Sequence, residues 1–333
     1  MENTLVEKIT SNFDIKTITV NEKKIDQKIK NEVILFLIEN QIIIEDEIYF
    51  FSICREYSYN DNPTPDLLKH VYICKNNGVK FINDSILNCH QPSIYKKMDV
   101  YKYFQAPDRN IDSIIKRPQN FYYDNIRRFE KIKTYITGKI YLDFACGYGG
   151  MIDKCSDICK DIIGIEIMDS AINILKQRFK FKFYNSIDII ENNTIDVISV
   201  FQSFELLPDH IGYLQKFYNK LKTGGKFIIE TSNANKALYN VYNNDGYKNF
   251  ITSLRKVIYS EDAIKFLLMS IGFNNITVEY VQRYNISNHF GWLSHNKPGN
   301  DVLLMDNDEL NKIYKETLIN KKHSDTLFII CEK

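Results

Sequence analysis

The chain has 333 residues, with 43 lysines and arginines against 42 aspartates and glutamates. Such a balanced charge creates no long-range field that would attract nucleic acid or an anionic membrane surface. The length suffices for one core of about 200 to 250 residues and a smaller second one. We therefore expect two units, no nucleic-acid partner and a small-molecule ligand.

The first twenty residues mix charged with apolar side chains and lack the continuous apolar stretch of a signal peptide. No run of apolar residues in the chain reaches the length that a membrane-spanning helix requires. We therefore expect a cytoplasmic protein without membrane insertion.

Seven cysteines are scattered along the chain, and their odd number argues against a disulfide framework. Cys155 and Cys159 lie four positions apart in an expected helix, where buried packing is favoured over metal binding. A second group resembles a zinc set: Cys54, Cys74, Cys89 and His90. Asn76 and Asn77 stand where a second ligand of a paired motif is needed, so no metal is assigned.

Residues 1–95 combine one helical segment, Lys24 to Asn40, with β-rich runs at 42–54 and 70–84. No chemical motif occurs there, so we expect a smaller α+β accessory domain. Residues 96–135 are rich in Tyr, Phe, Arg and Asp. They predict a linker that becomes helical near Gln119 and is suited to act as a flap over a site.

From Lys139 onward, short apolar strands alternate with amphipathic helices. Strands are expected at 139–144, 162–167, 181–185, 194–202, 224–231, 276–284 and 325–333. Helices are expected at 170–181, 210–221 and 260–273. This order predicts an α/β fold with a doubly wound, Rossmann-like sheet of seven strands whose last strand is antiparallel. It occupies 136–333, with an insertion at 284–323.

The first of these strands runs into the segment DFACGYGG, from Asp143 to Gly150. Glycines at a strand-to-helix turn permit positive φ and let the backbone approach a ligand closely. Glu166 closes the second strand, nineteen positions after Gly147, where a carboxylate can accept hydrogen bonds from both hydroxyls of a ribose. The pattern predicts a pocket for a nucleoside cofactor.

The glycine spacing does not by itself separate S-adenosylmethionine from NAD, because Ala145, Gly147 and Gly150 also satisfy a loose dinucleotide pattern. Asp143 favours the former, since a carboxylate can accept from the methionine ammonium but repels a pyrophosphate. An NAD-dependent oxidoreductase of sugar metabolism stays open as the alternative enzyme.

On these motifs the sequence resembles the class I S-adenosylmethionine-dependent methyltransferases, most closely over residues 119–233. DFACGYGG resembles the first family motif, with Ala145 in place of the usual first glycine, and IGIEI resembles the second. The resemblance implies S-adenosylmethionine as cofactor, with the ribose on Glu166 and the reacting methyl near Phe201 and Gln202. The full implied set is Asp143, Ala145, Cys146, Gly147, Gly149, Glu166, Ile167, Ser186, Ile187, Phe201 and Gln202.

Two further segments point to a subfamily. SFELLPDH aligns with a stretch that carries a histidine in many small-molecule methyltransferases, and here Leu206 stands at that position. Residues 282–300 are similar to a segment of methyltransferases encoded in bacterial surface-polysaccharide gene clusters. This likeness implies polysaccharide biosynthesis and a sugar or glycan-precursor acceptor, methylated at a hydroxyl. Ala145 and Leu206 leave a non-catalytic methyltransferase-like subunit open.

The candidate bases are His289, His295, Glu205 and His210. The segment around Trp292 is either a lid that stacks on a sugar and supplies a histidine, or a surface excursion pinned by that tryptophan. His210 begins an expected helix and is interpreted chiefly as a capping or exposed residue. The accessory domain is interpreted as a homodimer interface or a substrate-presenting surface, and both stay open.

Overall fold

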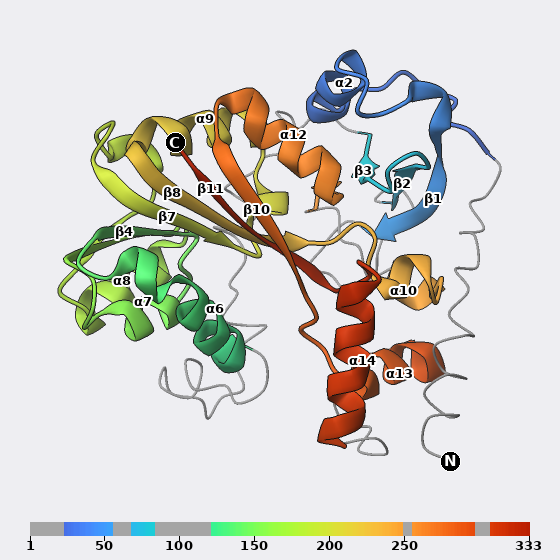
Figure 1. Ribbon diagram of the computed structural model, residues 1–333. Helices are drawn as coiled ribbons and strands as arrows, with labels where there is room; N and C mark the ends of the chain where they lie inside the picture. Colours follow the sequence, from blue (N-terminus) through green and yellow to red (C-terminus); the bar gives the residue numbers. More distant parts are fainter. Residues whose placement is uncertain (1–22, 56–67, 84–120, 249–254, 297–306) are drawn as a thin grey trace. The chain divides into compact units, whose positions relative to one another are not determined.

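The computed structural model describes residues 23–55, 68–83, 121–248, 255–296 and 307–333. Figure 1 shows the ribbon, in which the chain divides into two compact units. Unit 1 comprises Met1–Ser85, Ser232–Ile264 and Tyr280–Leu327, and unit 2 comprises Ile86–Thr231, Lys265–Glu279 and Phe328–Lys333. Each unit thus draws on segments that are distant in sequence.

The main sheet has seven strands in the order β10-β11-β8-β7-β4-β5-β6. Their bounds are β4 Ile140–Phe144, β5 Asp161–Ile165, β6 Lys182–Tyr184, β7 Ile195–Phe201, β8 Leu221–Ser232, β10 Asn274–Val281 and β11 Thr326–Glu332. The five strands from β8 to β6 are parallel. Lys333 exchanges backbone hydrogen bonds with Gly224 and Gly225, whereas Asp325 pairs with Asn233. Strand β11 therefore runs antiparallel to β8, which confirms the predicted mostly parallel sheet with its reversed last strand.

Helices cover both faces of this sheet. Figure 1 shows α6 (Phe121–Ile136), α7 (Gly150–Cys155) and α8 (Asp169–Arg178) on one face, with α9 (His210–Lys220) and α12 (Glu261–Ile271) on the other. Helix α8 buries Ala171, Ile172 and Leu175, which is the spacing of an amphipathic helix. The predicted helices near Gln119 and at 170–181, 210–221 and 260–273 are confirmed.

Strand β4 lies between β5 and β7, and its residues Tyr141 to Phe144 are all buried. The chain leaves β4 toward β5 on one side, while the later strands continue on the other side of β4. In doubly wound sheets, this switch point opens a crevice at the carboxyl ends of the strands. The DFACGYGG segment therefore lies where such folds bind their ligands.

Unit 1 contains a second, antiparallel sheet with the order β1-β2-β3-β9. The strands are β1 Ile48–Arg55, β2 Leu68–Cys74, β3 Lys80–Ile82 and β9 Val257–Ile258. The helices of the unit are α2 Glu32–Glu39, α10 Ala237–Asn240, α11 Asp245–Lys248, α13 Ile286–His295 and α14 Asp308–Asn320. Because β9 comes from far along the chain, the N-terminal strands share their sheet with a later segment. The accessory domain of residues 1–95 stays a prediction, and its limit falls outside the described residues.

The prediction that a helix begins at Lys24 is wrong. Helix α2 begins at Glu32, because the side chain of Asn31 accepts a hydrogen bond from the backbone N–H of Ile34 and caps the helix. Lys24 instead forms a bridge with Tyr49. Among the described helices, none combines the length and apolarity needed to cross a membrane.

Candidate functional site

The turn that follows β4 depends on left-handed backbone conformations. Ala145, Gly147 and Gly149 have φ values of 57°, 55° and 80°. A Cβ on Gly149 would lie 2.7 Å from Leu175 Cδ2, so close packing excludes a side chain there. A Cβ on Gly147 would meet nothing within 4 Å. Gly147 therefore faces open space that a ligand can occupy.

Glu166, directly after β5, reaches back to this turn. Its Oε2 accepts from the Gly147 N–H at 2.9 Å and its Oε1 accepts from the Met168 N–H at 3.0 Å. Burial raises the pKa of this carboxyl, which is 6% exposed. Each carboxylate oxygen retains a second lone pair, so both ribose hydroxyls can still be accepted. The open space at Gly147 and this oriented carboxylate fit a nucleoside cofactor.

Asp143 lies inside the sheet layer rather than on the turn itself. Ser199 Oγ donates to Asp143 Oδ1 at 2.9 Å, and the Tyr141 hydroxyl lies 2.6 Å from the same Ser199 oxygen. Burial raises the pKa of Asp143 to about 7. A nearby ammonium would favour the charged form of Asp143. The expected contact with the methionine amine stays a prediction.

The other residues expected to contact the cofactor differ in burial and in hydrogen bonding. Burial raises the pKa of Cys146 well above its usual value, which keeps it a packing thiol. Ser186 caps the short helix Ile187–Ile189 by accepting from the Asp188 N–H, and Ile187 is buried. Ile167 is half-buried beside Glu166. The ligand contacts expected of these residues stay predictions.

A buried ionic network that the sequence analysis missed surrounds Gln202. Glu230 is fully buried and accepts from Arg127 and from Arg128, each at 2.7 Å. Gln202 Nε2 donates to the same carboxylate at 3.1 Å. The Arg128 guanidinium also lies 4.9 Å from the centre of the Phe201 ring. A glutamate inside the apolar strand GGKFIIET was the available sequence signal.

Two of the four candidate bases belong to unit 2 and are fully buried. Glu205, in the short helix Phe204–Leu206, accepts from Thr231 Oγ1 at 2.7 Å. His210 is not the exposed residue that was expected, and Asp209 rather than His210 caps α9. Burial lowers the pKa of His210 to about 3, which makes it a weak base.

The other two candidates lie on α13 of unit 1. His289 is 1% exposed, and its ring nitrogens lie 2.6 Å from the Tyr314 hydroxyl and 3.3 Å from Asp325 Oδ1. His295 is exposed at the end of the helix. Trp292 is 5% exposed and packs edge-on against Tyr247, with 4.9 Å between ring centres. The structure thus supports a pinning role for Trp292; residues 297–306 of the expected lid lie outside the described residues.

The segment that holds the glycine turn is similar to a known protein family. Residues 114–278 match the family described as methyltransferase domain. Over these residues the chain is similar to a methyltransferase domain. The strand order and the position of Glu166 agree with that assignment, and S-adenosylmethionine is the cofactor of this class of enzyme.

Two curated relatives match a similar length of sequence. A probable S-adenosylmethionine-dependent methyltransferase of Mycolicibacterium smegmatis is 24% identical over 114 residues, covering 32% of this chain and 42% of the relative. A demethylmenaquinone methyltransferase of Oceanobacillus iheyensis is 26% identical over 108 residues, covering 28% and 45%. The chain spans less than half the length of either relative.

The chain also resembles solved structures. A possible histamine N-methyltransferase of Thermotoga maritima has a TM-score of 0.48 at 15% identity, covering 73% of this chain and 100% of that one. An S-adenosylmethionine-dependent methyltransferase of Archaeoglobus fulgidus has a TM-score of 0.44 at 19% identity, covering 64% and 94%. The fold assignment rests on the strand order and the family match.

Proposed function

We propose that the protein transfers the methyl group of S-adenosylmethionine to a hydroxyl of a small-molecule acceptor, a sugar or glycan precursor. The observation that carries the cofactor part is the turn in which Gly147 faces open space while its N–H fixes the Glu166 carboxylate. The likeness of residues 282–300 to methyltransferases of polysaccharide gene clusters supports the sugar acceptor. A cytoplasmic location and a homodimer stay predictions.

The bound cofactor supplies an electrophilic methyl on a sulfonium. The protein then has to orient the acceptor and exclude water, because the reaction is a direct displacement. Glu166 would hold the ribose hydroxyls, and Asp143 the methionine ammonium. The Gln202 N–H donates to the Glu230 carbonyl at 2.6 Å, which would hold the Gln202 backbone in place beside the methyl group.

For a hydroxyl acceptor, a base that removes the proton aids the reaction. The candidate His289 lies in unit 1, where the Asp325 carboxylate orients its ring. The Tyr314 hydroxyl lies between His289 Nδ1 and the Tyr242 hydroxyl, at 2.6 and 2.7 Å. Glu205, His210 and His295 stay alternatives.

A non-catalytic methyltransferase-like subunit is the second candidate. The observation in its favour is Ala145, which adopts φ 57° where the family usually has glycine. A non-glycine residue held in this region costs about 1 kcal/mol or more, which weakens the turn. Cofactor binding without turnover on any acceptor would support this alternative.

Thermal unfolding with S-adenosylhomocysteine and, separately, with NAD tests the proposal. We expect S-adenosylhomocysteine to raise the melting temperature and NAD to leave it unchanged; the reverse result would overturn the methyltransferase assignment. Glu166→Ala should abolish the shift, whereas Glu191→Gln, at an exposed position of the same unit, should preserve it. Labelled methyl transfer to a panel of sugars and sugar phosphates then tests the acceptor class.

A further inference from the structure

Glu230 is a fully buried carboxylate near the carboxyl end of β8. In the pairing of β7 with β8, it stands opposite Phe201. A carboxylate is stable in such a place only where donors surround it, because removing its charge from water is costly. The donors that hold Glu230 come from α6 and from the end of β7, so this one side chain connects both elements to β8.

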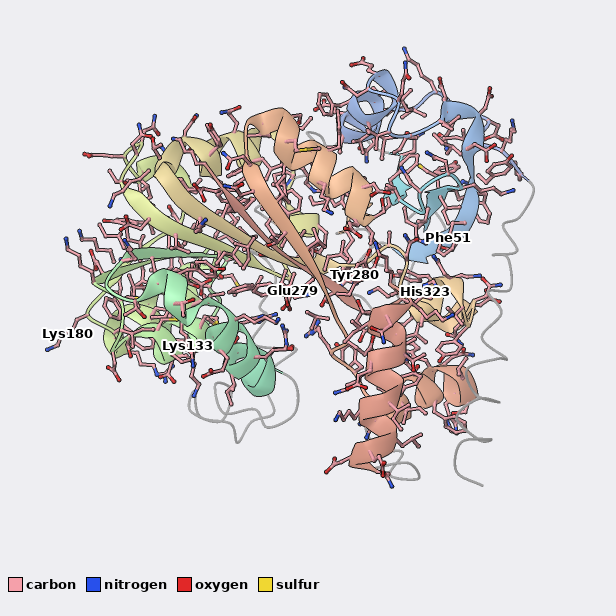
Figure 2. The ribbon with its side chains drawn as sticks, in the orientation of Figure 1. Phe51, Lys133, Lys180, Glu279, Tyr280 and His323 are labelled. Atoms are coloured by element: carbon pink, nitrogen blue, oxygen red, sulfur yellow. The ribbon has the colours of Figure 1, made fainter. Side chains whose placement is uncertain are left out.

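Two consecutive arginines hold the carboxylate from α6, the helix on which Figure 2 labels Lys133. Arg127 Nη2 donates to Glu230 Oε2 and Arg128 Nη2 donates to Glu230 Oε1, each at 2.7 Å. Hydrogen bonds between ionised groups are short and strong, and two guanidinium groups favour the charged form of a carboxyl. Glu230 therefore has a fixed orientation in unit 2.

The same glutamate fixes Gln202 through two hydrogen bonds. Gln202 Nε2 donates to Glu230 Oε1 at 3.1 Å, and the backbone N–H of Gln202 donates to the Glu230 carbonyl at 2.6 Å. Gln202 has a φ of 53°, a left-handed conformation that persists in a residue other than glycine only where the surroundings hold it. Glu230 thus holds both the backbone and the side chain of Gln202.

The contact with Glu230 decides which end of the Gln202 amide is left for a ligand. An ionised carboxylate only accepts hydrogen bonds, so the amide nitrogen has to face it. The amide oxygen Oε1 then remains an acceptor that Glu230 does not use. Gln202 is half-buried, so a bound molecule can reach its side chain. The residue therefore offers a ligand an oxygen rather than an N–H donor.

Gln202 borders the crevice that holds the glycine turn. Strands β4 and β7 are parallel neighbours, and Val200 stands opposite Phe144, so Gln202 follows β7 beside the turn that begins at Ala145. Glu166 follows β5, on the opposite side of β4. A nucleoside cofactor whose ribose binds Glu166 would therefore extend across the turn toward Gln202.

We infer that Glu230 is a positioning residue for methyl transfer, which directs the Gln202 amide oxygen to the sulfonium methyl group of S-adenosylmethionine. This inference rests on the proposed function. The methyl group shares the positive charge of the sulfonium, so an amide oxygen attracts it. S-adenosylhomocysteine lacks both the methyl group and the charge. Gln202 should therefore favour binding of S-adenosylmethionine over binding of S-adenosylhomocysteine.

Isothermal titration of the full chain with each of the two ligands tests the inference, and the ratio of their dissociation constants is the readout. Gln202→Gly tolerates the left-handed conformation and removes the amide, so it should lower the preference for S-adenosylmethionine about threefold. Leu214→Ala, at a buried position of α9, is the control. It should lower the melting temperature by leaving a cavity and keep the ratio. An unchanged ratio in Gln202→Gly would refute the inference.

Glu230→Gln separates positioning from a purely structural role. The Gln202 amide then loses its orientation and two guanidinium groups face no carboxylate, so the preference should fall at least as far as in Gln202→Gly. The double variant should lose less than the two single variants combined, because part of both effects passes through one amide. Equal losses of affinity for both ligands, or fully additive effects on the ratio, would contradict the inference. If Glu230→Gln does not fold, the Gln202→Gly result decides.

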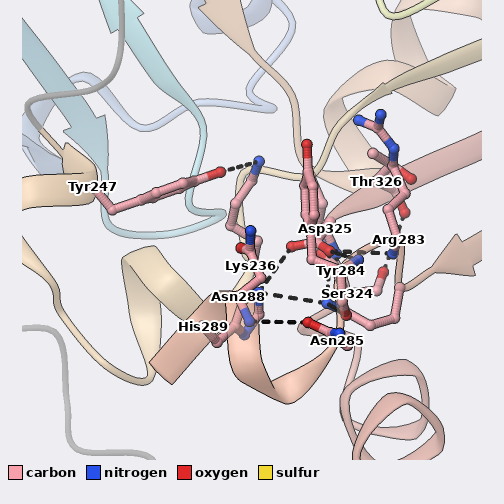
Figure 3. Close-up of polar contacts among 12 residues, drawn as sticks. Lys236, Tyr247, Arg283, Tyr284, Asn285, Asn288, His289, Ser324, Asp325 and Thr326 are labelled. Atoms are coloured by element: carbon pink, nitrogen blue, oxygen red, sulfur yellow. Dashed lines mark hydrogen bonds and ion pairs between the residues drawn. The ribbon is translucent and has the colours of Figure 1, made fainter. Parts of the chain in front are cut away.

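The inference and the proposed function can fail separately. The titrations contain no acceptor, so a base does not enter the result; the candidate His289, which Figure 3 shows beside Asp325, belongs to unit 1. Binding of neither ligand would overturn both the cofactor assignment and the inference. Binding of both ligands, with a ratio that Gln202→Gly leaves unchanged, would remove only the role of Glu230 and Gln202.

Discussion

Arg128 on α6 and Glu230 on β8 are 102 positions apart in the chain, and their side chains meet at 2.7 Å in the buried interior of unit 2. Glu230 also holds Arg127 and the amide of Gln202. The network therefore ties a helix that precedes the sheet to the ends of two central strands. It positions Gln202, which the family resemblance places near the reacting methyl.

Replacing Glu230 with Gln should be strongly destabilising. The substitution leaves two arginines facing a neutral amide in a buried site, and breaking such a pair costs about 3 to 5 kcal/mol. Urea unfolding measures the free energy of unfolding. Glu130→Gln, which loses only an exposed ion pair with Lys133, is the control and should cost under about 1 kcal/mol. Equal losses of unfolding free energy in the two variants would show that the buried network stabilises the protein no more than an exposed ion pair does.

Ala145→Gly should stabilise the protein and tighten cofactor binding. Ala145 is exposed at φ 57°, so glycine relieves backbone strain, although it also adds entropy to the unfolded chain. The expected net gain is up to about 1 kcal/mol. Thermal unfolding with and without S-adenosylhomocysteine measures both effects. A loss of stability would mean that the alanine methyl makes contacts worth more than the strain.

Asp143→Asn should remove a pH dependence of stability. Burial raises the folded-state pKa of Asp143 from 3.8 to about 7. A group with a raised folded pKa contributes stability below its unfolded pKa, and that stability is lost as the pH rises toward 7. The parent should lose about 2 to 3 kcal/mol from this group between pH 5 and pH 8, and the variant should not. Parallel pH profiles of the two proteins would contradict the assignment.

His210→Gln should remove a pH dependence of the opposite sign, in which the free energy of unfolding decreases as the pH falls. Burial lowers the folded-state pKa of His210 from 6.5 to about 3, so the stability it contributes is present above 6.5 and lost as the pH falls. The parent should lose about 2 kcal/mol from this group between pH 8 and pH 5. Urea unfolding of parent and variant at both pH values measures the difference, which should vanish if the imidazole is accessible to protons in the folded state.

The order of the central strands and helices could be predicted from the sequence, because it rests on local periodicity. Strand β4 was expected at 139–144 and lies at Ile140–Phe144; α9 was expected at 210–221 and lies at His210–Lys220. The glycine turn and Glu166 were likewise found from spacing alone, since the turn chemistry and the end of β5 are both local features. The start of α2 was missed because the cap at Asn31 outweighed the apolar pattern before it.

The sequence by itself determined the doubly wound sheet, the glycine turn and the carboxylate that faces it, because each depends on residues close together in the chain. Only the tertiary structure decided that β9 pairs with β3, that Glu230 holds Arg128, and that Lys80, Lys236 and Lys248 share two rings. The first two contacts join residues about 180 and 102 positions apart, and whether a charge is buried depends on which distant segments cover it.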